Sequence, residues 1–265
     1  MVVRRRPRIA LLIVFFTIHL TARSQIEPDS STARPSFSQD EWHASFSPYL
    51  WMAGLNGNVA LLGHEVAVDQ SFGDILGNLK FGFMGLTEVR RGSFGVLTDL
   101  LYIRLGDEGA VAVEQLPAAV NLKASANTFL LSPVVAYRVY ADRVFAADAL
   151  AGVRYYHLYA SINGSVPGVG GETYSGTNNW ADAVGGARFQ LRLTHKAEAF
   201  FIGDAGGGGS SPTWQIVTGV GYQVAKRTAL QVGYRHLYFN RQDGSSFGLD
   251  TTMEGFLVGA TIRLK

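Results

Sequence analysis

The C-terminal segment of the chain, residues 254–265, alternates between apolar residues and small or polar ones. Phe256, Val258, Ala260, Ile262 and Leu264 occupy every second position, with Gly, Thr and Arg among the residues between them. Because successive side chains of a β-strand point to opposite faces, this spacing places an apolar stripe on one face of a strand. The same alternation recurs along the chain, so the sequence predicts many half-apolar strands.

The alternation predicts ten strands, joined by connections of two lengths. The connections after the second, fourth, sixth and eighth strands are short, and those after the odd-numbered strands are longer. This arrangement is typical of an up-and-down barrel with both termini at one end. Eight or twelve strands would satisfy the same rule. The expected strands span residues 42–53, 80–90, 94–105, 121–140, 144–159, 180–193, 197–204, 213–224, 228–241 and the segment after the loop 243–246.

The first long connection, residues 54–79, has internal structure of its own. Its apolar pattern predicts a small hairpin that pairs residues 59–62 with residues 66–69. Ser71 and Asp74 then match the capping pattern that precedes a helical turn. The other long connections, residues 106–120, 160–179 and 206–212, are expected to be loops. Within the first strand Pro48 is unfavourable, because proline cannot donate a ladder hydrogen bond.

Strands of about ten or more residues are long enough to cross a bilayer. An unpaired backbone group costs several kcal/mol in hydrocarbon, so the sheet must close on itself. We therefore predict an all-β fold, a single closed antiparallel transmembrane β-barrel of about ten strands. The alternative is a secreted soluble β-barrel that binds a small hydrophobic ligand inside, which alternation alone does not distinguish. Aromatic residues near the strand ends fit two interfacial girdles: Tyr137, Tyr140, Phe145 and Tyr222 at the short-turn end, and Tyr155, Tyr159, Trp180, Trp214 and Tyr238 at the other.

The N-terminal region predicts export. Residues 1–24 combine four arginines within the first eight residues, an apolar run and the small-x-small site Ala22-Arg23-Ser24, which contains a fifth arginine, as in a secretory signal peptide. Residues 25–41 are expected to be a flexible leader, and residues 42–265 the barrel domain. Cleavage after Ser24 leaves 18 basic and 21 acidic residues, so the precursor's formal charge of +2 becomes −3. This balance argues against a nucleic-acid partner.

With these strands and turns, the chain resembles small OmpA/OmpW-like outer-membrane β-barrels of Gram-negative bacteria. Its segment Gly259-x-x-Ile262-x-Leu264 is similar to the terminal signal that the barrel assembly machinery reads, although the usual final Phe is missing. The resemblance implies an outer-membrane location with both termini in the periplasm. It implies outer-membrane lipids or lipopolysaccharide and the assembly machinery as partners. A monomer is the default expectation.

Charged residues on the less apolar faces of the strands are the candidate site. They are expected to line the lumen, either as a narrow or gated pore or as ion pairs that plug it. Eight strands are just filled by side chains, so a barrel of ten is narrow. The predicted lumen residues are Glu88, Asp99, Asp148, Arg154, Asp182, Arg188, Arg192, Asp204, Arg235 and Arg263.

Catalysis is the second class of function considered, as a lipid-modifying hydrolase or acyltransferase at the rim. His157, His236, Ser161 and Asp250 could gather there, but no nucleophile motif accompanies them. The six histidines are scattered and there is no cysteine, so no metal or other cofactor is expected. The glycines at 206–209 lack the Lys-Ser/Thr of a phosphate loop. We therefore expect a non-enzymatic barrel with a structural or narrow-pore role.

Overall fold

The computed structural model describes residues 41–61, 64–111, 120–166, 170–243 and 247–264. The predicted signal peptide and almost all of the predicted leader lie outside these residues. The described residues form strands and one short helix, in the order β1 (Trp42–Leu61), β2 (His64–Gln70), α1 (Phe72–Gly77), β3 (Leu79–Arg91), β4 (Phe94–Val111), β5 (Val120–Ala141), β6 (Phe145–Val166), β7 (Gly170–Arg192), β8 (Ala197–Gly208), β9 (Thr213–Ala225), β10 (Thr228–Asp243) and β11 (Phe247–Arg263).

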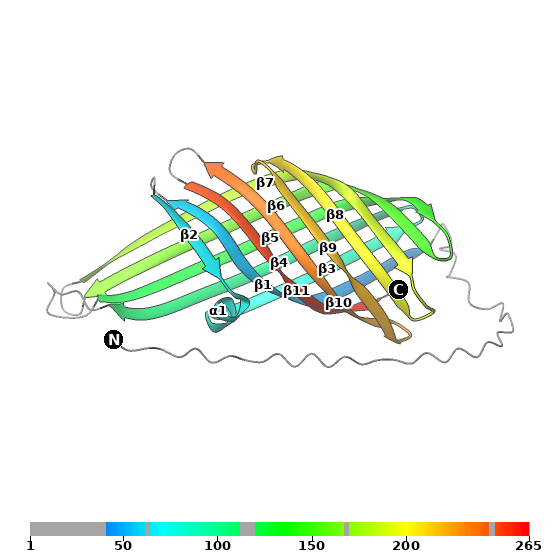
Figure 1. The fold of residues 1–265 in the computed structure, drawn as a ribbon, viewed down its shortest axis with the longest axis horizontal. Helices are drawn as coiled ribbons and strands as arrows, with labels where there is room; N and C mark the ends of the chain where they lie inside the picture. The colour runs from blue at the N-terminus through cyan, green and yellow to red at the C-terminus, as the bar shows by residue number, and fades with distance from the viewer. Residues whose placement is uncertain (1–40, 62–63, 112–119, 167–169, 244–246, 265) are drawn as a thin grey trace, which may run out of the picture. The chain divides into compact units, whose positions relative to one another are not determined.

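The strands form a closed barrel of ten, as predicted. From β3 to β11 each strand pairs with the next, β3 also pairs with β1, and β11 returns to β1 (Figure 1). All of these pairings are antiparallel; the closing one aligns Ser45 with Arg263 and Trp51 with Leu257. Closure gives every barrel strand a neighbour on each side over at least part of its length, which removes the two free edges that an open sheet would expose to hydrocarbon. β2 lies outside the ring and pairs only with the far half of β1.

The two faces of the wall have opposite chemistry. Large apolar side chains such as Val135, Leu191 and Val232 are exposed on the outer face. The ionised side chains of Asp148 and Arg154 are buried within the barrel, at 2% and 0% exposure. A soluble barrel would show the reverse arrangement, so the alternative of a secreted soluble barrel is wrong. Among the described helices, none has the length and apolar character needed to cross a bilayer.

The predicted hairpin and helical turn are both present. β1 continues beyond its expected end and pairs with β2, with Val59 opposite Val66. In the capping box that begins α1, the Ser71 hydroxyl accepts from the Asp74 N–H at 3.2 Å, and the Ser71 N–H donates to Asp74 Oδ2 at 3.0 Å. The local sequence signals therefore correctly predicted this part of the long connection.

The expected loops 106–120 and 160–179 are wrong, because much of each is strand. β4 runs to Val111, β6 to Val166, and β7 starts at Gly170. These extensions carry polar and small residues on both faces, so they lack the alternation that identifies a lipid-facing strand. Their hairpin partners extend equally and keep the backbone ladder in register, for example Asn163 opposite Thr173. β5, β6 and β7 are the longest strands in Figure 1.

Two residue-level expectations also change. Trp180 does not belong to the outer aromatic girdle: it lies on the same face of β7 as Asp182 and is buried in the interior. The loop expected at 206–212 starts later, because Gly206 to Gly208 continue β8. A Cβ on Gly206 would lie 1.9 Å from the carbonyl oxygen of Ala183, so only glycine fits this close strand contact.

The predicted short turns join Arg91 to Phe94, Ala141 to Phe145, Arg192 to Ala197, and Ala225 to Thr228. The start of β1 and the end of β11 lie at this same end, since the first residues of β1 pair with the last of β11. Pro48 is accommodated where the β1–β11 ladder skips two residues, between the pairs Phe46–Ile262 and Tyr49–Gly259.

Candidate functional site in the barrel interior

An ion-pair cluster fills the interior near the short-turn end, and Asp148 of β6 is its centre. Its carboxylate accepts from Arg188 at 2.8 and 2.6 Å, from Arg90 at 3.2 Å, and from Arg138. Glu88 accepts two further bonds from Arg188, at 2.8 and 2.9 Å, and one from Arg90 at 3.0 Å. The planar guanidinium of Arg188 thus binds two carboxylates at once, a geometry that lysine could not supply.

The Arg188–Glu88 ion pair crosses the lumen. Arg188 is on β7 and Glu88 on β3, and three strands separate them along the sheet. Two side chains from opposite walls can meet at 2.8 Å only if nothing wider than those side chains lies between them. At this level the interior is therefore closed by bonded side chains.

A second cluster surrounds Arg154 of β6, which is fully buried. Its guanidinium donates to Asp204 of β8 at 2.7 Å and to Ser132 of β5 at 3.3 Å. Asp204 also accepts from the side-chain amide of Gln215 at 2.6 Å. A buried charge is tolerated when it is paired and hydrogen-bonded, and this arrangement meets both conditions.

A second cross-lumen ion pair joins Arg235 of β10 to Asp99 of β4, at 2.8 Å. Three strands also separate these two along the sheet. The phenolic O–H of Tyr49 donates to Asp99 at 2.6 Å, and its oxygen accepts from Arg235 at 3.0 Å. The guanidinium of Arg235 lies 4.7 Å from the ring centre of Trp51, within cation–π distance.

An aromatic layer lies on the loop side of these charges. Tyr156 and Trp180 stack with their ring centres 4.6 Å apart, and Phe239 packs against both. Leu101 and Leu237 belong to the same buried cluster. The interior is thus filled by ion pairs toward the short turns and by apolar rings toward the long loops.

Seven of the ten predicted lumen residues take part in the ion-pair clusters: Glu88, Asp148 and Arg188 in the first, Arg154 and Asp204 in the second, Asp99 and Arg235 in the cross-lumen pair. Asp182 is buried separately and accepts from the Ser210 N–H at 2.6 Å. Arg192 is partly buried and Arg263 is exposed at the short-turn end, so the structure does not bring these two into the clusters.

The predicted lumen residues leave out five polar participants of these clusters: Tyr49, Arg90, Ser132, Arg138 and Gln215. Each shares a strand face with predicted lumen residues or polar neighbours, so alternation could have identified them. Among the described residues, the clusters together with Asp182 contain five arginines (Arg90, Arg138, Arg154, Arg188, Arg235) and five acidic residues (Glu88, Asp99, Asp148, Asp182, Asp204). The formal charges therefore balance within the interior.

The residues considered for a rim hydrolase are dispersed. His236 of β10 bonds Glu254 at 3.0 Å and stacks on Trp214, whereas His157 of β6 bonds Asn179 at 2.6 Å. Three strands separate β6 from β10. The described part of the chain also shows no group of three or more His, Asp or Glu residues that could hold a metal ion.

No protein-family model matches the chain, and no curated protein matches its sequence. Solved structures do match its fold. The outer membrane protease OmpT from Escherichia coli aligns over 88% of this chain and 100% of its own, with a TM-score of 0.50 and 9% identity. Ail, the attachment invasion locus protein of Yersinia pestis, aligns over 85% and 99%, with a TM-score of 0.34 and 12% identity. At such identities the likeness concerns the fold alone, which is that of Gram-negative outer-membrane β-barrels.

Proposed function

We propose that this chain is a Gram-negative outer-membrane protein whose barrel is a closed structural scaffold, not a conducting channel or an enzyme. In this proposal both termini face the periplasm, and the extended hairpins of β4 to β7 project outside the cell. The monomer is inserted by the barrel assembly machinery. Its functional surface is then the external end and the lipid-facing wall, since the interior is occupied by its own side chains.

The observation that carries the proposal is the bonding across the lumen. The Arg188–Glu88 pair and the Arg235–Asp99 pair each join two strands that have three other strands between them along the sheet. A conducting barrel needs a continuous path of water, and these pairs occupy that path at two positions. Separating such a pair would leave both charges unpaired in the interior, so thermal fluctuations would rarely open it.

The proposed membrane location is supported by the outer face of the barrel. Apolar side chains cover the wall where a bilayer would contact it, and the closed ladder satisfies most of the backbone of the wall. The orientation rests on connection length, because barrels of this kind place short turns in the periplasm and longer loops outside.

The second candidate function is a narrow, water-filled pore through the lumen, and one observation favours it. Within the described interior, Nε and Nη2 of Arg235, Oγ1 of Thr251 and Oε1 of Gln215 are buried without a hydrogen-bond partner in the protein. Buried polar atoms normally have partners, so ordered water is expected beside them. A gated pore would require these hydration sites to join into one path.

Ion conductance across a planar lipid bilayer separates the two candidates. The refolded chain from residue 25 onward should give no discrete steps, with insertion confirmed by heat-modifiable gel migration. The quadruple variant Arg188→Ala, Glu88→Ala, Arg235→Ala and Asp99→Ala removes both cross-lumen pairs and equal numbers of positive and negative charges, so it should leak more. Lys196→Ala with Arg227→Ala, at exposed turns, is the matched control and should stay silent. Reproducible steps from the unmodified chain would overturn the closed-scaffold proposal.

A further inference from the structure

The barrel wall has a break between β1 and β3. Their pairing ends at Pro48–Gly85, and the pairing of β1 with β2 begins only at Leu55–Gln70. Between these points β1 has a ladder partner on one side only, which is β11. In the break the backbone N–H of Trp51 donates to the thioether sulfur of Met84 at 3.4 Å, a weak acceptor in place of a carbonyl. The hydrogen-bonded wall is therefore open here.

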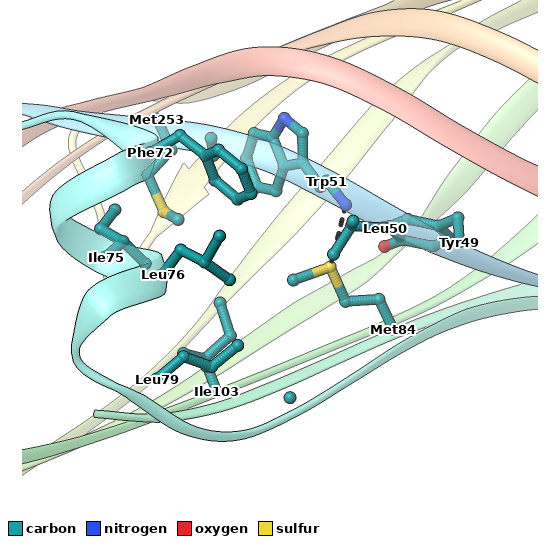
Figure 2. Close-up of a pocket in the computed structure, with 12 residues that line it drawn as sticks. Tyr49, Leu50, Trp51, Phe72, Ile75, Leu76, Leu79, Met84, Ile103 and Met253 are labelled. Carbon is teal, nitrogen blue, oxygen red and sulfur yellow. Dashed lines mark hydrogen bonds between the residues drawn. The ribbon is translucent and has the colours of Figure 1, made fainter. Parts of the chain in front are cut away.

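Helix α1 covers this break with apolar side chains. Figure 2 shows Phe72 and Leu76 of α1 turned toward Trp51 and Met84, and Ile75 of α1 also lines the space beneath the helix. They leave a cavity of about 100 Å³ whose other lining is also mainly apolar. An apolar cavity of this size stays dry, and it is much smaller than a typical ligand pocket of about 300–1,000 Å³. It suits the end of an alkyl chain and not a compact polar ligand.

The mouth of the break faces the outside of the barrel. Leu50 of β1 and Leu76 of α1 line the cavity yet are 44% and 51% exposed. On the adjoining outer face of β3, Phe81 and Phe83 are 55% and 44% exposed. A lipid chain lying against these two rings would reach the cavity without leaving apolar surroundings.

Positive side chains lie immediately beyond this apolar area. A second cavity, of about 270 Å³, is lined by Lys80, Arg104 and Lys123 together with Ser125, Ser161 and Asn163, and one acidic residue, Asp107, also borders it. A register shift between Leu79 and Phe81 directs Lys80 to the outer face, where a Cβ on Gly106 would lie 3.0 Å from Lys80 Cε.

This cluster is charged and incompletely paired. Lys80 and Arg104 are exposed, and neither forms an ion pair with another described residue. Lys123 also lines this cavity, but it already has an interaction partner of its own. Like charges held close together repel, and a bound anion would relieve that repulsion. The hydroxyls of Ser125 and Ser161, which bond each other at 2.8 Å, add neutral donors for phosphate oxygens.

We propose that the two cavities form one binding site for an anionic membrane lipid. Its phosphate binds Lys80 and Arg104, with Lys123 nearby, and one acyl chain passes over Phe81 and Phe83 to end beneath α1. The two parts adjoin on β3, because Leu79 and Gly82 line the apolar cavity and Lys80 lines the charged one. This inference rests on the proposed membrane location, but not on whether the lumen conducts.

Native mass spectrometry of the full barrel, released from detergent, tests whether the charged cavity binds the lipid phosphate. The probes are phosphatidic acid and phosphatidylcholine with identical chains. Lys80→Gln with Arg104→Gln should weaken phosphatidic acid binding about tenfold or more and leave phosphatidylcholine binding unchanged, since a hydrogen bond to a charged group contributes at least a factor of ten. Lys196→Gln with Arg227→Gln removes the same charge from exposed turns and should change neither. Equal losses in both double variants would overturn the proposal.

Filling the cavity beneath α1 tests whether it holds the acyl chain of the lipid. Ile75→Trp, which enlarges a side chain lining the cavity beneath α1, should weaken long-chain phosphatidic acid but leave the binding of inorganic phosphate unchanged. If inorganic phosphate displaces the lipid at equal concentration, the site recognises a free anion and the lipid proposal is wrong. Flotation of each variant with vesicles shows separately whether the barrel enters a membrane, so failure of the location is distinguishable from failure of the site.

Discussion

The folding free energy lost when one arginine is placed on the outer face reports how deep that position lies in the bilayer. Ala187 of β7 lies on that face, is partly exposed, and pairs with Ala149 of β6. It is five residues from the end of β7 at Arg192. At about 3.3 Å per residue and a strand tilt of about 40°, it lies roughly 13 Å from the short-turn end, near the middle of an apolar band about 25 Å tall.

Ala187→Arg should therefore cost about 2–4 kcal/mol of folding free energy, the range for a cation at the bilayer midplane. Val153→Arg, on β6 and nearer the loop end by the same reckoning, should cost less. Asp182→Asn, in the interior, should be milder than either substitution because its Oδ1 can still accept from Ser210.

The assay is reversible urea unfolding in phospholipid vesicles, followed by tryptophan fluorescence. Thr177→Arg provides the matched control, since Thr177 lies on the same face of β7 in the polar extension and is exposed. It should change the free energy by about 0–1 kcal/mol. Ala187→Leu separates side-chain size from charge and should also be nearly neutral. Equal costs for arginine at 177 and 187 would refute the assignment of the lipid-facing band.

Three other predictions concern the interior and α1. Arg154→Met should destabilise the barrel by about 3–5 kcal/mol by leaving Asp204 without its cation, and adding Asp204→Asn should restore part of the loss in urea titrations. Trp180→Ala should cost about 3–5 kcal/mol in the same assay, because the ring is buried and stacked; a loss below 1 kcal/mol would place it outside the core. Hydrogen bonds from Ser71 hold the pKa of Asp74 below the usual range, so its capping contribution is present above pH 3.8 and is lost as pH falls through the lowered pKa. Carboxyl ¹³C shifts should show this, and Ser71→Ala should raise the pKa of Asp74 toward its ordinary value, while the backbone N–H of residue 71 continues to lower it.

The sequence by itself determined most strands of the barrel wall and the face that most of their side chains occupy. Both follow from local alternation, which is why the charges of β6 and β7 were correctly directed inward. The capping box of α1 and the hairpin before it were also readable, because their bonds join residues close together in the chain. Where alternation disappears, as in the polar extensions after Leu105 and Tyr159, the sequence wrongly suggested loops.

Only the tertiary structure decided which charges meet and where the wall is open. Arg188 binds its ladder neighbour Asp148, but it also reaches Glu88 on β3. That second contact exists because barrel closure and strand stagger place β3 across the lumen from β7, and neither closure nor stagger is encoded in any single strand. The break beside Trp51 has the same origin: β1 exchanges its partner from β3 to β2 along its length, a choice made by the whole sheet. The local sequence pattern determines which face of its strand a side chain occupies, whereas pairing across the lumen depends on how all ten strands close.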